Sequence, residues 1–264
     1  MSDIIVERYG DILHIELNRP SRKNALTSSM YTTLARTFAN AREDELIRVV
    51  LWYGAGDSFC AGNDIEDFLK NPPASDDSPQ LRLTNAFIAF DKPIVAAVQG
   101  SAVGGGTTML THCDFVYAGE SAKFQMPFVN LGLVPEFGSS YSVPARIGYL
   151  RVAELFLSGG PFDARHAAEI GLVTRVVPDE DLLATATATA HKLAEKPNGA
   201  LRAGKRLIKQ ASLDQLRDAV SREGKEFTER IRSAEAKEAF AAFLEKRPPN
   251  FSNEAPFAPG EARR

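Results

Sequence analysis

The sequence predicts an α/β protein, in which buried strands alternate with helices up to about residue 179 and helices alone follow. Short apolar and β-branched runs end at glycine-rich turns, as buried strands do. After residue 179, apolar residues recur at helical spacing instead. With 264 residues, of which 44% are hydrophobic and 25% charged, the chain has the composition of a globular protein with a sizeable core.

The first elements expected are two strands and a helix. Residues 4–6 and 12–17 flank a turn at Tyr9-Gly10-Asp11 and are predicted to be strands. Residues Ser28 to Arg42 are predicted to form an amphipathic helix, because apolar residues recur there about once per turn. These apolar residues are Met30, Leu34, Phe38 and Ala41.

Three further strands are predicted to be buried, at residues 48–53, 93–98 and 114–118. A short helix from Gly104 to Leu110 is expected between the last two. The polar stretch that contains Pro72, Pro73 and Pro79 is predicted to be a surface loop.

The C-terminal part is predicted to be helical, with Ser212 as a candidate cap for a long helix. Its apolar positions are Leu213, Leu216, Val220, Phe227 and Ile231. A last helix carries Phe240, Phe243 and Leu244 before Pro248-Pro249 ends it. These helices have too narrow an apolar face to fold alone, so we expect them to pack on the core or on another subunit.

Composition excludes several classes of protein. A net charge of -3 with scattered basic residues argues against nucleic-acid or membrane-surface binding. No apolar run approaches the ~20 residues that span a bilayer. Cys60 and Cys113 are too few for a disulfide framework or a four-ligand zinc site, and the histidines lack metal-ligand spacing. Because the cysteines and histidines do not form a ligand set, we expect no bound metal. No secretory signal is recognised, so we expect a cytoplasmic protein.

Two turns carry the functional information, Phe59 to Ile65 and Gly100 to Gly106. Their small residues allow a ligand to approach backbone N–H groups closely. The second turn runs into a helix, whose free N–H groups favour negative charge. Two such donors would form an oxyanion hole. The alternative, that these glycines only permit tight turns and close packing, is equally open on this pattern alone.

A set of ordered motifs extends over nearly the whole chain, to about Lys246. The motifs are Asn18-Arg19-Pro20, Asn24-Ala25-Leu26, Phe59-Cys60-Ala61-Gly62-Asn63-Asp64, Lys92 to Gly100, Gly104-Gly105-Gly106, Cys113-Asp114, Ala122-Lys123-Phe124, Leu131 to Pro135 and Gly171-Leu172-Val173. In order and spacing they resemble the enoyl-CoA hydratase/isomerase (crotonase) superfamily.

The resemblance implies a fold and a ligand. The fold is a crotonase-like spiral of ββα units in residues 1–195, followed by a helical trimerisation region in residues 196–264. The backbone amides of Asn63 and Gly105 are expected to bind the carbonyl oxygen of an acyl-CoA thioester. Coenzyme A is expected as part of the substrate, with no tightly bound cofactor, at Arg22, Ala25, Ala61, Gly62, Asp64, Ile65, Phe243 and Lys246. A homotrimer or a dimer of trimers is expected, in which the last two residues reach the CoA of a neighbouring subunit.

The identity of the base separates the branches of this family. Its hydratases use two glutamates, and the matching positions here are Thr108 and Phe128, which have no basic side chain. Glu136 stands among apolar neighbours, where desolvation would raise its pKa towards useful basicity. Without the family context, Glu136 would be read as a surface residue at the start of a helix. Within it, Pro135-Glu136-Phe137-Gly138-Ser139-Ser140 resembles the catalytic segment of the peroxisomal-type Δ3,Δ2-enoyl-CoA isomerases.

The leading hypothesis is therefore a Δ3,Δ2-enoyl-CoA isomerase with Glu136 as its single catalytic base. An enoyl-CoA hydratase with unusual base placement is the second hypothesis. A member of the family that binds acyl-CoA without turning it over is the third.

Overall fold

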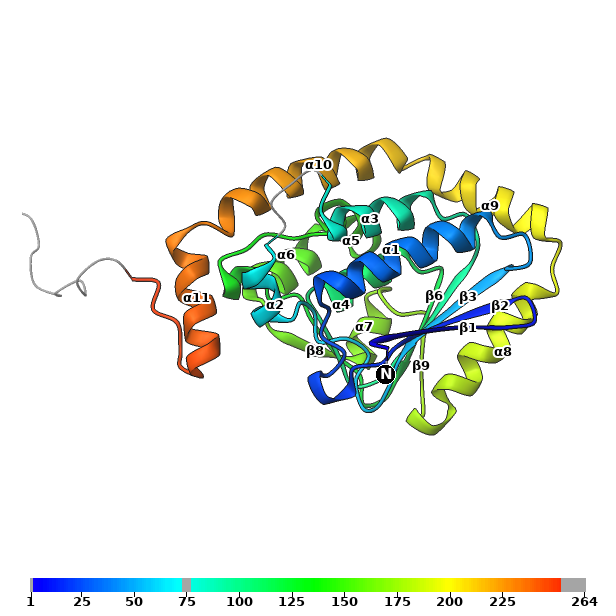
Figure 1. The fold of residues 1–264 in the computed structure, drawn as a ribbon, viewed down its shortest axis with the longest axis horizontal. Coiled ribbons are helices and arrows are strands. Elements are labelled where there is room, and N and C mark those ends of the chain that lie inside the picture. The colour runs from blue at the N-terminus through cyan, green and yellow to red at the C-terminus, as the bar shows by residue number, and fades with distance from the viewer. Residues whose placement is uncertain (1, 73–76, 253–264) are drawn as a thin grey trace, which may run out of the picture.

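The computed structural model describes residues 2–72 and 77–252, and a six-stranded sheet lies at its centre (Figure 1). The strand order is β1-β2-β3-β4-β6-β9. The strands are β1 (Ile4–Tyr9), β2 (Ile12–Leu17), β3 (Val49–Gly54), β4 (Ile94–Val98), β6 (Phe115–Gly119) and β9 (Arg175–Val177). Within this sheet β1 and β2 pair antiparallel, and each later pair is parallel.

Helices cover both faces of this sheet, which explains why β3 and β4 are almost continuous apolar runs. On one face lie α1 (Ser28–Glu43) and α3 (Pro79–Ala89). There the fully buried Trp52 of β3 contacts the rings of Phe38 and Phe87, with centroids 5.9 and 5.6 Å away. The other face is covered by α8 (Leu182–Ala194), which turns a stripe of buried alanines towards the sheet.

A second, three-stranded sheet has the order β5-β7-β8, and its strands come between those of the first sheet along the chain. They are β5 (Ser101–Val103), β7 (Lys123–Gln125) and β8 (Pro161–Asp163). β4 is followed by β5 and α4 (Gly105–Thr108), and β6 is followed by β7 and later by α5 (Ser139–Ile147). After β3, Cys60 pairs with Ala102 of β5, and α2 (Ile65–Lys70) comes next. The predicted spiral of ββα units is confirmed.

Most predicted elements are confirmed with small changes at their ends, but two predictions are wrong. The predicted loop does not include Pro79, because Pro79 begins α3 and Ser78 caps that helix by accepting the Leu81 amide (3.2 Å). Proline suits a first helical position because the N–H that it lacks has no partner there. Pro73 lies outside the described residues. Ser212 stands at the start of α10, but its hydroxyl donates to the Lys209 carbonyl and does not cap the helix.

The C-terminal helices form an arch along one side of the core (Figure 1). They are α9 (Asn198–Gln210), α10 (Leu213–Arg230) and α11 (Ala234–Glu245). In the chain, α6 (Tyr149–Ser158) follows α5, and α7 (Ala164–Glu169) lies between β8 and β9. Among residues 2–72 and 77–252, no helix is both long enough and apolar enough to cross a membrane.

Basic side chains hold α9 on the core. The nearly buried Asp91 accepts hydrogen bonds from Arg202 (3.1 Å) and Arg206 (2.7 Å). The buried Lys205 forms an ion pair with Asp114 (2.7 Å). Burial alone would raise the pKa of Asp91, but its bonds to the two arginines lower it overall. Because these charges are partly desolvated and paired, they contribute more than exposed ion pairs do.

We predict that Asp91→Asn lowers the free energy of unfolding by roughly 1–3 kcal/mol, because Arg202 and Arg206 lose their shared partner. Urea denaturation measures this change. Asp214→Asn is the matched control, since Asp214 is exposed and lies 3.9 Å from Arg217. The control should change the free energy by less than ~0.5 kcal/mol. Equal stability of Asp91→Asn and the parent would contradict this docking.

Candidate active site

Glu136 lies in the turn that precedes α5, at the edge of a cavity of about 880 Å³. The cavity is bounded by this turn, by Leu81 and Thr84 of α3, and by Val220 and Phe227 of α10. The backbone turns sharply here, because Phe137 and Gly138 both have left-handed φ angles, of 62° and 71°. The turn therefore places Glu136 in the wall of this cavity, together with residues of α3 and α10.

Gly105 lies directly against the Glu136 carboxyl group. A Cβ atom at Gly105 would stand 2.9 Å from Oε1 of Glu136 and 3.3 Å from the hydroxyl oxygen of Tyr31. Gly105 is the first residue of α4, and among the described residues its amide N–H has no protein acceptor, as expected at a helix start. A free backbone donor and a carboxyl group thus share one small space.

Asn63 belongs to the same cluster. The hydroxyl of Tyr31 donates to Asn63 Oδ1 (2.8 Å), so one side chain of α1 contacts both Asn63 and the surroundings of Gly105. The loop before Asn63 is held by backbone hydrogen bonds, from Cys60 to Ser101 (2.9 Å) and from Leu26 to Gly62 (2.7 Å). Within the described chain the amide of Asn63 also donates to no protein acceptor. The structure therefore brings together the three residues predicted to be catalytic, Asn63, Gly105 and Glu136.

Glu136 is the residue of this cluster that can take up and release a proton near neutral pH. Burial, followed by the negative charge of Glu223, raises the pKa of Glu136 to about 8. Burial, and then the charge of Glu136, raises the pKa of Tyr31 well above its usual value, so Tyr31 stays a neutral donor. Burial raises the pKa of Cys60 to about 12, which keeps it a thiol. Among these three groups, Glu136 alone gains and loses a proton near neutral pH.

The two positions at which the hydratases carry glutamates hold no acid here. The hydroxyl of Thr108 donates to the Gly104 carbonyl (3.3 Å) within its own helix. Phe128 is buried against the ring of Phe156. Within the part of the chain that the structure describes, no three His, Cys, Asp or Glu side chains gather as a metal site would require.

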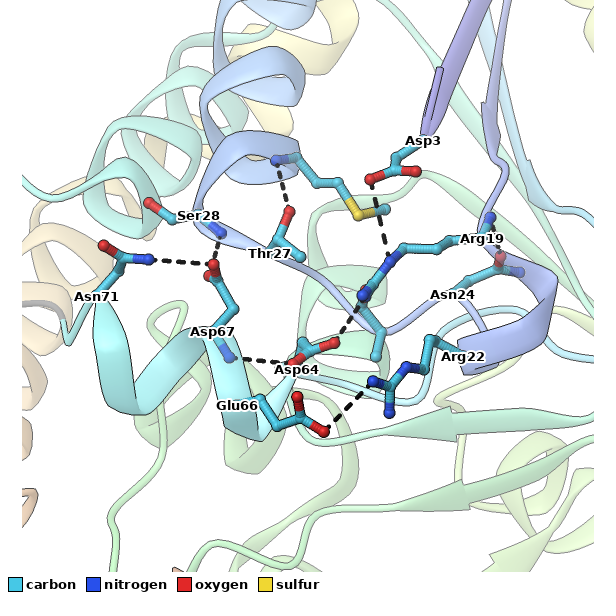
Figure 2. Close-up of polar contacts among 12 residues, drawn as sticks. Asp3, Arg19, Arg22, Asn24, Thr27, Ser28, Asp64, Glu66, Asp67 and Asn71 are labelled. Atoms are coloured by element: carbon cyan, nitrogen blue, oxygen red, sulfur yellow. Dashed lines mark hydrogen bonds and ion pairs between the residues drawn. The ribbon is translucent and has the colours of Figure 1, made fainter. Parts of the chain in front are cut away.

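Six of the eight residues predicted to bind coenzyme A lie in two segments, and Figure 2 shows Arg22 of the first and Asp64 of the second. The segments are joined by backbone pairing, because Ala61 donates to the Lys23 carbonyl (2.9 Å). Arg22 is exposed and forms an ion pair with Glu66 (3.3 Å). The structure thus brings Arg22, Ala25, Ala61, Gly62, Asp64 and Ile65 close together.

Asp64 stabilises these segments by capping α2 and by pairing with Arg19. Its carboxylate accepts the Asp67 amide at the start of α2 (3.1 Å) and pairs with Arg19 (2.8 Å), as Figure 2 shows. Burial alone would raise the pKa of Asp64, but the Asp67 amide and Arg19 lower it overall. Phe243 is an exposed residue of α11, and Lys246 directly follows the end of that helix.

Sequence reasoning missed two residues of the site, Tyr31 and Glu223. Tyr31 reads as one more apolar residue of the α1 stripe, and nothing in the sequence indicates where its hydroxyl lies. Glu223 did leave a signal. It falls between Val220 and Phe227 at helical spacing, so an acid interrupts the apolar stripe of α10. A charged residue on the buried side of a helix is expected to have a partner.

Comparison with known proteins shows the family of the chain. The family model for enoyl-CoA hydratase/isomerase matches residues 7–254. Enoyl-CoA delta isomerase 2 of Rattus norvegicus is 35% identical over 93% of the chain, which spans 64% of the rat protein's length. The 2,3-dehydroadipyl-CoA hydratase of Escherichia coli K12 is 34% identical over 95% of the chain and 99% of its own length.

A solved structure supports the same assignment. The crystal structure of an enoyl-CoA hydratase/isomerase from Pseudoalteromonas atlantica T6c superimposes with a TM-score of 0.90. That protein is 40% identical, and the alignment covers 95% of this chain and 100% of the other. The chain belongs to the enoyl-CoA hydratase/isomerase family, and the resemblance seen in its sequence is confirmed.

We predict that Gly105→Ala lowers kcat by about 100-fold while the fold survives, because the new methyl group displaces the end of the flexible Glu136 side chain. Turnover of an enoyl-CoA substrate together with thermal unfolding measures both effects.

Gly106→Ala is the matched control for this variant. A Cβ at Gly106 would clash with the backbone carbonyl of Cys60, which cannot move aside. We expect this control to lose about 1–3 kcal/mol of stability. Full activity of Gly105→Ala would contradict the proximity of Gly105 to the reacting groups.

Proposed function

We propose that this protein is a Δ3,Δ2-enoyl-CoA isomerase, with Glu136 as its base and the amides of Asn63 and Gly105 as its oxyanion hole. The observation that carries the proposal is the position of the Glu136 carboxyl group, beside Gly105 and at the edge of the cavity. The absence of acids at Thr108 and Phe128 supports one-base chemistry, since shifting a double bond needs one group that takes and returns a proton.

The mechanism begins with the ionised form of Glu136. Its carboxylate removes a proton from C2 of a 3-enoyl thioester, and the electron pair moves towards the carbonyl oxygen. The two free amides stabilise the dienolate oxygen, and each such donor contributes about 3–4 kcal/mol in comparable sites. The same carboxyl group then returns the proton to C4, and the double bond lies between C2 and C3. A pKa of about 8 suits both transfers near neutral pH.

The remaining assignments concern the rest of the substrate and the assembly. We assign the adenine and pantetheine parts of CoA to the segments Arg22–Ala25 and Ala61–Ile65, and the acyl group to the cavity beside Glu136. We also propose a trimer or a dimer of trimers. Exposed apolar side chains support association, among them Leu207 and Ile208 of α9 at 75% and 80% exposure.

A hydratase is the second candidate, because a second carboxylate, that of Glu223, borders the same cavity. Both of its oxygens already accept backbone amides, which disfavours a role in activating water. Hydration of crotonyl-CoA that outpaces the isomerisation of 3-enoyl-CoA would support the hydratase. Tight binding of acyl-CoA without either reaction would support the non-catalytic alternative.

We predict that the purified protein converts 3-enoyl-CoA to the 2-trans isomer and that Glu136→Gln lowers kcat by roughly 100- to 10,000-fold through loss of the base. The ultraviolet absorbance of the conjugated thioester measures the product. Glu226→Gln, an exposed position on α10, is the matched control and should retain activity. Equal turnover by Glu136→Gln and the parent would disprove the mechanism.

We predict that Glu136→Gln, although it lowers kcat, makes the folded protein more stable than the parent at high pH. A pKa raised from 4.5 in the unfolded chain to about 8 means that the parent loses stability as the pH rises between these values. The variant has no such carboxyl group, so its advantage should grow over this range and reach roughly 2–4 kcal/mol above pH 8. Thermal unfolding at a series of pH values measures it, and parallel curves for the two proteins would contradict the burial of an ionising group.

A further inference from the structure

Glu223 of α10 is held by two short hydrogen bonds to the turn that carries Glu136. Its Oε2 accepts the amide of Gly138 and its Oε1 accepts the amide of Ser140, both at 2.7 Å. These amides lie at the N-terminal end of α5, where N–H groups lack helical partners and favour a negative charge. A buried side chain of the C-terminal helical region thus supplies the acceptor that this helix start requires.

The turn needs this support because its backbone is strained. Phe137 has a bulky side chain and a φ of 62°, a conformation that costs about 1–3 kcal/mol for such residues. On the other side of the turn, Nε2 of His112 contacts the Phe137 carbonyl oxygen (2.9 Å). Burial lowers the pKa of His112 to about 3, so the ring is neutral and donates this hydrogen bond from Nε2. Glu223 and His112 therefore fix the turn from opposite sides.

Glu223 also acts on Glu136 through its charge, since both carboxyl groups border one cavity. The other groups that bear on Glu136 are Tyr31 of α1 and Cys60, which stay neutral. Around the cavity, α10 adds two cations and one acid, and a further cation influences Glu223. These are Arg217, Lys225, Glu229 and Arg222. Only the charge of Glu223 is both buried and fixed by two hydrogen bonds to the turn that bears the base.

We propose that Glu223 is a positioning residue for Glu136: it ties the strained turn to α10 and keeps a second negative charge beside the base. The proposal rests on the proposed role of Glu136. It makes the docking of α10 part of the active site, because a core without this helix would have the base but neither its anchor nor its neighbouring charge. The amide hydrogens that both oxygens of Glu223 accept favour its ionised form, so we assign it no proton transfer with the substrate.

We test this proposal with Glu223→Gln, which keeps the shape of the side chain and removes its charge. The carbon-13 signal of the Glu136 carboxyl group, assigned with Glu136→Gln, reports its titration in the folded protein without any turnover. We expect the midpoint to fall by roughly one pH unit when the like charge is removed. The low-pH limb of kcat should move in the same direction. Glu226→Gln, with the same loss of charge on the exposed side of α10, should leave the midpoint unchanged.

Glu223→Asp tests the anchoring separately. It keeps the charge, but a side chain one methylene shorter cannot reach both amides. We expect kcat to fall by about 10-fold or more at every pH, with KM little changed, because the base is misplaced. Full kcat in Glu223→Asp would overturn the anchoring even if Glu223→Gln failed to fold.

The titration separates this proposal from the proposed function. An unchanged Glu136 midpoint in folded Glu223→Gln would overturn the proposal whether or not the parent isomerises 3-enoyl-CoA. A lowered midpoint in a protein without isomerase activity would support the coupling of the two carboxyl groups and reject the isomerase.

Discussion

The close approach of two backbone turns is the constraint on which the site depends. Gly106 leaves no room for a side chain against the Cys60 carbonyl, so the first turn of α4 lies directly on the loop that leads to Asn63. This contact leaves the amides of Asn63 and Gly105 without protein acceptors in the same region. Tyr31 then joins α1 to both turns, and Glu136 closes the group from the other side.

The electrostatics of the site depend on burial more than on ion pairs. Asp91 offers a contrast, because two arginines of α9 pair with this buried acid. Among the described residues no cation forms an ion pair with Glu136, and the charge that raises its pKa further is that of another acid, Glu223. Glu136 therefore tolerates a proton at a pH where ordinary glutamates do not. Burial makes the ionised form costly, which destabilises the folded protein at high pH, and the ionised form is the one that removes a proton in the proposed mechanism.

The sequence predicted the strands, the spiral and the three residues that the structure gathers, because these depend on local patterns and on family motifs. It did not predict α3, since Pro79 was read as a loop residue although proline also begins helices. Tyr31 and Glu223 were missed for another reason. Their importance comes from residues far away in the chain, and a hydroxyl or a carboxylate on an apolar helix face does not reveal which turn it will meet.

The position of the two free amides after neighbouring strands has a broader consequence. β3 and β4 are adjacent and parallel, and the segments that follow them pair again where Cys60 meets Ala102, so backbone pairing keeps the two turns close. Backbone geometry sets this separation, and most side-chain substitutions leave it intact. Evolution can then move an acid from one facing element to another without rebuilding the proposed oxyanion hole. Reaction type within such a fold is therefore easier to change than the kind of molecule it accepts.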